Sequence, residues 1–378
     1  MLGRLRLGPH HLRGRRYGEP VHPFRSEFER DRDRITHARA FRRLEGKTQV
    51  FTAGSSDHFR NRLTHTMEVV QVARTVAANL GLNEHYTETL AFAHDLGHPP
   101  FGHVGEKELN KQMACFGDSF EHNRHALRIV DHLEERYARF PGLNLTFEVR
   151  EGIVKHSREV PDGTADAELK ELLPGLRPPL EAQLVDLADE IAYNTADIDD
   201  AFSVGLLRLE EIGEAVPAFG ELDIRVQSQF SGLTDRVRFW EIERQLLCTL
   251  IGGLIEATAA AANEAAVETI DDVRALGYRL ARYTPAAAET NRQMKQLLIG
   301  RVYSSLPLAE DRRVAVGKMS EMFEYLLEHP NQVSERYRER LEFEPRYRVV
   351  CDYIAGMTDS YFIKTYTNLI GGGMTPRE

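Results

Sequence analysis

Cysteine is scarce in this chain of 378 residues, and its three cysteines, Cys115, Cys248 and Cys351, form no spacing pattern. This scarcity excludes a disulfide-stabilised secreted scaffold and a thiolate zinc site, and it indicates a reducing compartment. Uninterrupted apolar runs long enough to span a bilayer are also missing. Hydrophobic residues make up 42% of the chain and charged residues 28%, which is typical of soluble globular domains. We therefore expect a cytoplasmic protein with no membrane partner.

Acidic residues are absent from residues 1–18, which contain five arginines. Because no apolar stretch follows, these residues do not fit a secretory signal, and we expect residues 1–29 to form a basic, flexible arm. Residues 1–62 hold 15 Arg or Lys and 7 Asp or Glu, which gives them a net charge of +8. Because the whole chain has a net charge of −10, the remaining residues carry a net charge of −18. The overall acidity argues against a dedicated nucleic-acid binder. The basic stretch suits a polyanionic small molecule or, more simply, a mixed-charge surface.

Helical periodicity dominates the sequence, and strand–helix alternation is missing. Apolar residues three and four apart predict a helix over residues 64–80, closed by Gly81, and a second over residues 83–95, capped by Asn83. Further helices are predicted over residues 104–113, 124–139, 180–202 and much of 206–378, with a polar connector at 310–313. A small hairpin at residues 48–51 or 143–149 is the most β-structure that we expect. The sequence thus predicts an all-α fold.

Residues 93–103, with the sequence AHDLGHPPFGH, are the most unusual stretch of the chain. They contain three histidines and one aspartate, and Gly97 and two prolines bend the backbone among them. Residues after such a bend can point back at the end of the helix before it. The adjacent pair His94 and Asp95 offers one imidazole nitrogen and one carboxylate to a single cation. This composition favours a metal-centred active site over an ordinary core.

Two further donors lie in helical contexts that indicate burial. His65 shares a stripe with Val69 and Val72, although a hydrogen-bonded core histidine is the alternative. Asp189 is flanked by apolar residues, and a buried aspartate without a partner is costly. A shared divalent metal would satisfy both of them together with His94 and Asp95. Two imidazoles and two carboxylates suit Mn²⁺, Fe²⁺, Co²⁺, Ni²⁺ or Zn²⁺, and Mg²⁺ suits the site if substrate phosphate oxygens complete its shell.

The order His65, His94-Asp95, Asp189 resembles the signature of the HD-domain phosphohydrolases, which hold a metal in a helical bundle. The flanking segments are similar to the deoxyguanosinetriphosphate triphosphohydrolase-like family. These segments are residues 30–35 (RDRDRI), 41–44 (FRRL), 47–51 (KTQVF), 101–103 (FGH), 120–123 (FEHN), 186–200 and 352–359 (DYIAGMTD). The resemblance implies a catalytic HD core over residues 30–205, with the HD motif region at about 61–198. A helical C-terminal region, residues 206–378, would follow and provide substrate and oligomer contacts.

The activity that this resemblance implies is hydrolysis of a deoxynucleoside triphosphate to deoxynucleoside and inorganic tripolyphosphate. A divalent metal is the implied cofactor, with Mg²⁺ or Mn²⁺ the first choices and Fe, Co, Ni or Zn the others. His103 and Glu106 lie three residues apart at the start of a predicted helix, so they can share one face. In the family, an imidazole–carboxylate pair at these places acts as base or acid, and His122 is similar to an active-site histidine that contacts the phosphates.

Substrate contacts are also implied by the resemblance. Tyr193 would pack against the deoxyribose, Asp197 and Gln49 would hold the 3′-hydroxyl, and Arg62 would bind a phosphate. His98 would lie beside the substrate. The residues alone leave other interpretations open, because Tyr193 suits a core aromatic, Asp197 suits a solvated helix face and His98 suits a loop-fixing role.

Two other functions remain as alternatives. One is another HD-family nucleotide phosphohydrolase, a 5′-nucleotidase or phosphodiesterase. The other is a nucleotide- or single-stranded-DNA-binding regulatory protein with little turnover, which would use the basic residues 1–62. The expected partners are deoxynucleoside triphosphates, a nucleotide activator, single-stranded DNA and further copies of the chain in a homo-oligomer. Lys47 is expected on the surface, with a phosphate contact as the alternative. No residue clearly reads a guanine edge.

Overall fold

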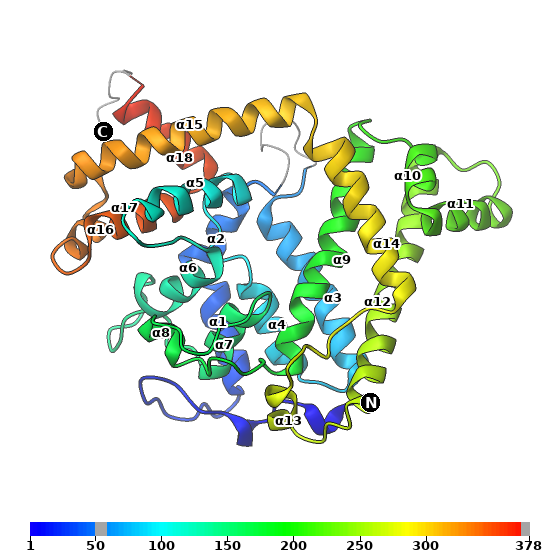
Figure 1. Ribbon diagram of the computed structural model, residues 1–378, viewed down its shortest axis with the longest axis horizontal. Coiled ribbons are helices and arrows are strands. Elements are labelled where there is room, and N and C mark those ends of the chain that lie inside the picture. The colour runs from blue at the N-terminus through cyan, green and yellow to red at the C-terminus, as the bar shows by residue number, and fades with distance from the viewer. Residues whose placement is uncertain (50–58, 372–378) are drawn as a thin grey trace. The chain divides into compact units, whose positions relative to one another are not determined.

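The computed structural model describes residues 1–49 and 59–371 (Figure 1). Every regular element in these residues is a helix, which confirms the predicted all-α fold. Three isolated bridges are the only β pairing among them: Arg15 with Thr146, Thr48 with Asn61, and Glu135 with Gly142. The hairpin that the sequence allowed at 143–149 does not form, since Phe147 already starts a helix. Residues 50 and 51 of the KTQVF segment lie outside the described residues.

The α-helices follow one another along the chain in numerical order. They are α1 (Glu27–Thr36), α2 (Arg39–Arg43), α3 (Arg62–Leu80), α4 (Glu84–Ala93), α5 (Gly102–Ala114), α6 (His122–Arg128), α7 (Phe147–Lys155), α8 (Ala167–Lys170), α9 (Leu180–Ser203), α10 (Leu209–Ala215), α11 (Pro217–Gln229), α12 (Asp235–Glu264), α13 (Ile270–Ala275), α14 (Pro285–Leu297), α15 (Leu306–Glu328), α16 (Glu335–Arg340), α17 (Arg346–Ala355) and α18 (Asp359–Leu369). Short 3₁₀ or π turns are η1 (Gly3–Leu5), η2 (Pro9–His11), η3 (Leu44–Gly46), η4 (Ile129–Leu133), η5 (Leu298–Tyr303) and η6 (Pro330–Gln332).

The helices that carry the predicted site begin and end close to the predicted positions. Gly81, at φ +76°, follows the last residue of α3 in the left-handed conformation that glycine adopts at helix ends. The side-chain oxygen of Asn83 accepts the Tyr86 N–H at 3.1 Å and so caps α4. α5 extends one or two residues beyond each end of its predicted range.

Two predicted segments differ from the structure. The helix predicted over 124–139 ends at Leu133, because Glu134 turns away: its carbonyl accepts the Gly142 N–H at 3.0 Å and its carboxylate accepts the Ala40 N–H at 2.8 Å. The polar connector predicted at 310–313 is instead part of α15. Glu310 and Arg313 form an ion pair at 2.7 Å, the i,i+3 arrangement that stabilises a helix.

The expected flexible arm at the N-terminus is also wrong. Leu2, Leu5 and Leu7 are buried, and the Leu7 N–H donates to the Glu181 carboxylate of α9 at 2.9 Å. Arg4 and Arg6 separate these leucines in the sequence, so the segment has no apolar run that would indicate burial. Apolar burial therefore orders a segment whose composition indicated disorder.

The chain forms two compact units that alternate along the sequence. The first comprises residues 1–34, 65–92 and 145–305, and the second comprises residues 35–64, 93–144 and 306–378. In the first unit, α9, α12 and α14 pack against one another. In the second, α5, α15 and α17 pack around one apolar core that includes Met113, Phe323 and Ile354. The predicted C-terminal region, residues 206–378, thus contributes to both units.

α12 is the one helix among the described residues that is long and apolar enough, by length and composition, to cross a membrane. Its apolar window has a mean hydropathy of 1.5 and is 44% buried. Core helices of soluble proteins pass the same test. Phe239, Leu246 and Leu250 of α12 are buried, and the helix packs against α9, α11 and α14 within the first unit.

Candidate active site

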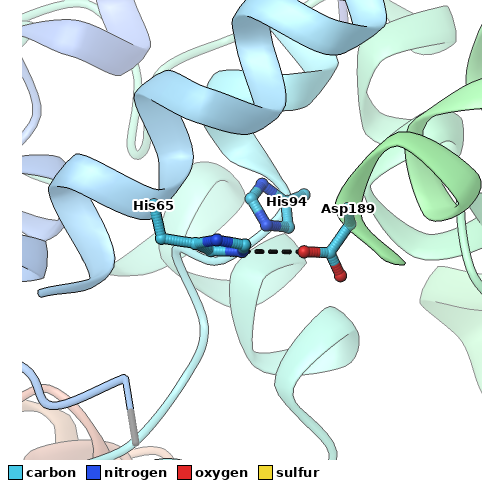
Figure 2. A group of neighbouring side chains, drawn as sticks. All are labelled: His65, His94 and Asp189. Carbon is cyan, nitrogen blue, oxygen red and sulfur yellow. Dashed lines mark hydrogen bonds and ion pairs between the residues drawn. The ribbon is translucent and has the colours of Figure 1, made fainter. Parts of the chain in front are cut away.

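The first unit contains two of the four predicted metal ligands. His65 lies in the first turns of α3 and is buried, on the stripe that includes Val69 and Val72. Its Nε2 atom lies 2.7 Å from Oδ1 of Asp189, which α9 presents (Figure 2). This hydrogen bond brings together an imidazole nitrogen and a carboxylate oxygen from residues 124 positions apart. The two predicted ligands of this unit are therefore adjacent.

The second unit contains the other two predicted ligands, His94 and Asp95, directly after the end of α4. Asp95 is buried, and its Oδ2 atom accepts a hydrogen bond of 2.7 Å from Nη1 of Arg62. Its Oδ1 atom lies 3.0 Å from Nδ1 of His98 and 3.5 Å from Nε2 of His94. Burial would raise the pKa of Asp95, but the positive charge of Arg62 and the two imidazoles hold it well below its usual range. Asp95 is thus a carboxylate at neutral pH.

Arg62, predicted to bind a phosphate, is buried against Asp95. Gly102 provides the room for it, since a Cβ atom at this position would lie 2.8 Å from Nη2 of Arg62. The φ of Gly102 is +59°, which also favours glycine. In the structure, therefore, Arg62 orients and neutralises the carboxylate of the HD pair.

Glu106 lies at the centre of the predicted catalytic residues. His103 and Glu106 face each other near the start of α5, with Nδ1 of His103 3.4 Å from Oε2 of Glu106. The other carboxylate oxygen lies 2.8 Å from Nδ1 of His122 and accepts the backbone N–H of His122 at 2.9 Å. One carboxylate thus holds two imidazoles that are 19 positions apart in the sequence.

The charges of this cluster follow from these contacts. Burial would raise the pKa of Glu106, but its hydrogen bonds to His103 and His122 lower it far below its usual range. Burial would lower the pKa of His122, yet the hydrogen bond and negative charge of Glu106 raise it overall. Glu106 therefore stays ionised, and it favours the protonated form of His122.

His98 completes the cluster. Its ring centroid lies 4.1 Å from that of His122 and 5.4 Å from that of His103. One ligand atom each of His98, His103 and Glu106 lies within 4.8 Å of the others. Burial and the nearby charge of Arg62 lower the pKa of His98 well below its usual value, so its imidazole is neutral. His103, by contrast, has a side chain that is 67% exposed.

Gly97 explains how the loop and α6 come together. A Cβ atom at Gly97 would lie 1.9 Å from the carbonyl oxygen of His122. Only glycine allows the loop backbone to approach the first turn of α6 so closely. This close approach is what places His98 beside His122.

Two predicted substrate residues lie in the first unit. Tyr193 and Asp197 are one turn apart on α9, and the hydroxyl of Tyr303 donates to the Asp197 carboxylate. Asp197 is 2% exposed, so the solvated-face interpretation is wrong. The rings of Tyr193 and Tyr303 have centroids 6.1 Å apart. Sequence reasoning missed Tyr303, which has no motif around it and comes from η5, 106 positions after its partner.

Gln49 and Lys47 lie in the second unit. The side-chain oxygen of Gln49 is buried and has no hydrogen-bond partner among the described residues. Lys47 is 3% exposed, so its expected surface position is wrong. Its ammonium group donates to the carbonyl oxygens of His98 and, at 3.1 Å, Ala355. These two backbone acceptors hold the buried amino group in place.

Comparisons with known proteins extend these observations. The HD domain family matches residues 62–194, and the phosphohydrolase-associated domain family matches residues 281–368. A deoxyguanosinetriphosphate triphosphohydrolase-like protein of Geobacter sulfurreducens is 43% identical over 359 residues, which cover 94% of this chain and 92% of the relative. Proteins of the same description from Ralstonia nicotianae and Bordetella pertussis are 44% and 42% identical, over 94% and 97% of this chain and 91% and 95% of their own lengths. The predicted resemblance is confirmed, and the chain belongs to the deoxyguanosinetriphosphate triphosphohydrolase-like family of HD-domain proteins.

Proposed function

We propose that this HD-family hydrolase is a metal-dependent dNTP triphosphohydrolase, which converts a deoxynucleoside triphosphate to deoxynucleoside and inorganic tripolyphosphate. The observation that carries the proposal is the Glu106 carboxylate with His103 and His122 on its two oxygens. This cluster provides imidazoles at defined positions for proton transfer and for phosphate binding. The relatives are described as deoxyguanosinetriphosphate triphosphohydrolase-like proteins, and this name supports a deoxynucleoside triphosphate as the substrate class.

The proposed metal ligands are His65, His94, Asp95 and Asp189, of which Figure 2 draws three. The donor set fits a divalent ion, since it combines two imidazoles with two carboxylates. His65 and Asp189 already bring a nitrogen and an oxygen within 2.7 Å of each other. His94 directly follows α4, whose residues up to Phe92 belong to the same unit as His65. A bound Mg²⁺ or Mn²⁺ would polarise the α-phosphoryl group and lower the pKa of an attacking water.

The chain's own residues would handle the protons and the phosphate charge. Because Nδ1 of His122 faces Glu106, its Nε2 atom is left for the substrate, and the protonated ring offers a positive N–H to a phosphate oxygen. Glu106 also fixes the orientation of the His103 ring, whose exposed edge can exchange a proton with water or with the leaving 5′ oxygen. Neutral His98 would lie beside the substrate as a hydrogen-bonding group.

The deoxyribose contacts are proposed for Tyr193, Asp197 and Gln49. The side-chain oxygen of Gln49, buried and without a hydrogen-bond partner in the part of the chain that the structure describes, suits a hydroxyl donor such as the 3′-OH. Tyr303 would hold the Asp197 carboxylate in place for the same hydroxyl. Tyr193, one turn away, would pack against the sugar. We also propose that Arg62 contacts a phosphate of the substrate, in addition to its hydrogen bond to Asp95.

The basic N-terminal stretch gives little support to the nucleic-acid alternative. Arg15 contacts Glu27 at 2.6 Å, and Arg34 contacts Glu19 at 2.8 Å. Arg30 also contacts Glu27, at 2.8 Å. These three guanidinium groups pair with carboxylates within the first unit, so they are less suited to bind the phosphates of a nucleic acid.

The test is the identity of the product. Purified protein is incubated with each of the four dNTPs, alone and in mixtures, with Mg²⁺ or Mn²⁺, and the products are separated by anion-exchange chromatography. Tripolyphosphate and deoxynucleoside are the expected products. Release of only orthophosphate or pyrophosphate would contradict the proposal and favour another HD phosphohydrolase. Salt-dependent binding of single-stranded DNA without any product would favour a regulatory protein.

A further inference from the structure

Residues 352–359, DYIAGMTD, have no place in the proposed reaction, although they form one of the segments that resemble the family. They include the end of α17 and the first residue of α18, and they lie in the second unit. Four contacts within that unit connect residues 352–359 to the active-site segments, and one of them passes through Lys47. These segments carry Gln49, His98, His103 and His122.

Asp359 makes the first two contacts. Its carboxylate is 8% exposed and accepts the backbone N–H of Thr48 at 2.8 Å and that of Phe101 at 3.0 Å, one on each oxygen. Thr48 directly precedes Gln49, and Phe101 lies two residues before His103. A single carboxylate thus fixes the backbone of two active-site segments relative to each other.

Phe101 needs such support. Its φ is +63°, a left-handed conformation that costs a bulky residue free energy and persists only where the surroundings hold it. Its ring packs edge-on against the buried Phe362 of α18, with centroids 5.2 Å apart. α18 therefore holds both the amide and the ring of the residue at which the catalytic loop enters α5.

Lys47 makes the third contact. Its buried ammonium joins the carbonyl oxygen of His98 to that of Ala355, the last residue of α17. Carbonyl groups at a helix C-terminus lack intrahelical partners and favour a cation. The His98 backbone is thereby tied to the end of α17.

Asp352 makes the fourth contact, with α6. Its carboxylate receives Nε of Arg128 at 3.2 Å and lies 3.4 Å from Nδ1 of His125. Both partners follow His122 on the same short helix. Asp352 therefore holds the helix that presents His122.

We propose that residues 352–359 are a positioning segment for the active site, with Asp359 and Lys47 as the positioning residues that set the geometry of the catalytic loop. The hydrogen bonds of both side chains go to backbone groups. Both act on backbone groups of residues 48 and 98–101, and through them on Gln49, His98 and His103. The inference rests on the proposed function for its kinetic readout, but the loop geometry can be measured without any turnover.

Asp359→Asn tests the first positioning residue. A carboxamide offers one acceptor oxygen, so one of the two backbone N–H groups would face an NH₂ donor. We expect kcat to fall roughly 10- to 100-fold, as a small misplacement of reacting groups does, with a smaller change in KM. Hydrogen–deuterium exchange of the peptide covering residues 97–102 should rise. Glu134→Gln is the matched control, because this buried carboxylate also accepts a backbone N–H of the second unit, that of Ala40.

Lys47→Met tests the second positioning residue and guards against a variant that merely unfolds. Methionine keeps the length of the chain but loses both hydrogen bonds, while the burial of an ammonium group is relieved. These effects oppose each other, so the melting temperature should change little while kcat falls and exchange at residues 97–102 rises. Lys47→Arg, which keeps the charge and its donors, should restore part of kcat.

The outcomes separate the two proposals. If the wild-type protein releases no tripolyphosphate from any dNTP, the proposed function fails, and the exchange data alone decide the positioning inference. Increased exchange at residues 97–102 in Asp359→Asn and Lys47→Met, but not in Glu134→Gln, supports it. Unchanged exchange in both variants, or a kcat that falls equally in Glu134→Gln, overturns it.

Discussion

His65 with Asp189 and His122 with Glu106 are the same chemical pair in two different settings. Each is an imidazole beside a carboxylate, at 2.7 Å in the first unit and 2.8 Å in the second. The distal Nε2 atom faces the carboxylate in His65, whereas Nδ1 faces it in His122. Glu106 also receives the His122 backbone N–H and contacts His103. The two pairs thus differ in the imidazole nitrogen that faces the carboxylate and in the number of groups that the carboxylate holds. We assign the first pair to metal binding and the second to proton transfer.

Substitution at the first pair should have the largest effect, because it should remove both the bound metal and the turnover that depends on it. Asp189→Asn removes a carboxylate from the proposed ligand set, so we expect the bound metal to be lost. We expect kcat to fall more than about 10²-fold, because replacing a residue that only supports a metal ligand already lowers metal affinity or activity by up to about 10²-fold. Metal content by plasma mass spectrometry and tripolyphosphate release check this. Asp199→Asn, on the same helix with its carboxylate against Trp240 at 3.3 Å, should keep both. Full metal content in Asp189→Asn would rule out the ligand assignment.

Substitution at the second pair should separate metal binding from turnover. In Glu106→Gln the His103 and His122 rings lose their charged partner, and we expect kcat to fall about 10²- to 10⁴-fold, the usual contribution of acid–base groups. The metal should remain bound. Glu108→Gln on the same helix, where the carboxylate receives Gln112 at 2.7 Å, is the control. If Glu106→Gln loses metal as Asp189→Asn does, the distinction between the two pairs is wrong.

The second pair also predicts a pH effect. Glu106 raises the pKa of His122 against the opposing effect of burial, so Glu106→Gln should lower that pKa. If turnover needs protonated His122, the alkaline limb of the kcat profile should move to lower pH in the variant. Imidazole chemical shifts of His122, followed by NMR across the titration, check the pKa directly. An unchanged His122 titration would show that Glu106 does not control this proton.

Lys47 should produce the smallest effect, and it concerns stability. Burial, together with the charges of Arg62 and Arg43, lowers the pKa of Lys47 to about 7, from 10.5. Between these values the unfolded chain binds the proton and the folded chain does not, so stability should rise with pH through this window, by at most about 1.4 kcal/mol per pH unit. Lys47→Met should flatten that slope in urea unfolding measured at pH 7 to 10. An identical slope in the variant would contradict the assignment.

Local patterns in the sequence predicted much of this structure, whereas contacts between distant segments could not be predicted from it. The stripe of His65, the i,i+3 spacing of His103 and Glu106 and the cap at Asn83 depend on residues within one or two turns. The contact of Tyr303 with Asp197 joins segments that lie over 100 positions apart in the sequence, and so does the contact of residues 352–359 with the catalytic loop. Lys47 was expected at the surface because most lysines are exposed. Its burial is possible only where two distant carbonyl groups converge.

Hydrolysis in ¹⁸O-labelled water tests the central claim most directly. If water attacks the α-phosphorus of a dNTP, mass spectrometry should find one ¹⁸O atom in the released tripolyphosphate and none in the deoxynucleoside. Label in the deoxynucleoside would show attack at carbon, and label in pyrophosphate or orthophosphate would show cleavage further along the chain. Either of these results would contradict the proposed triphosphohydrolase.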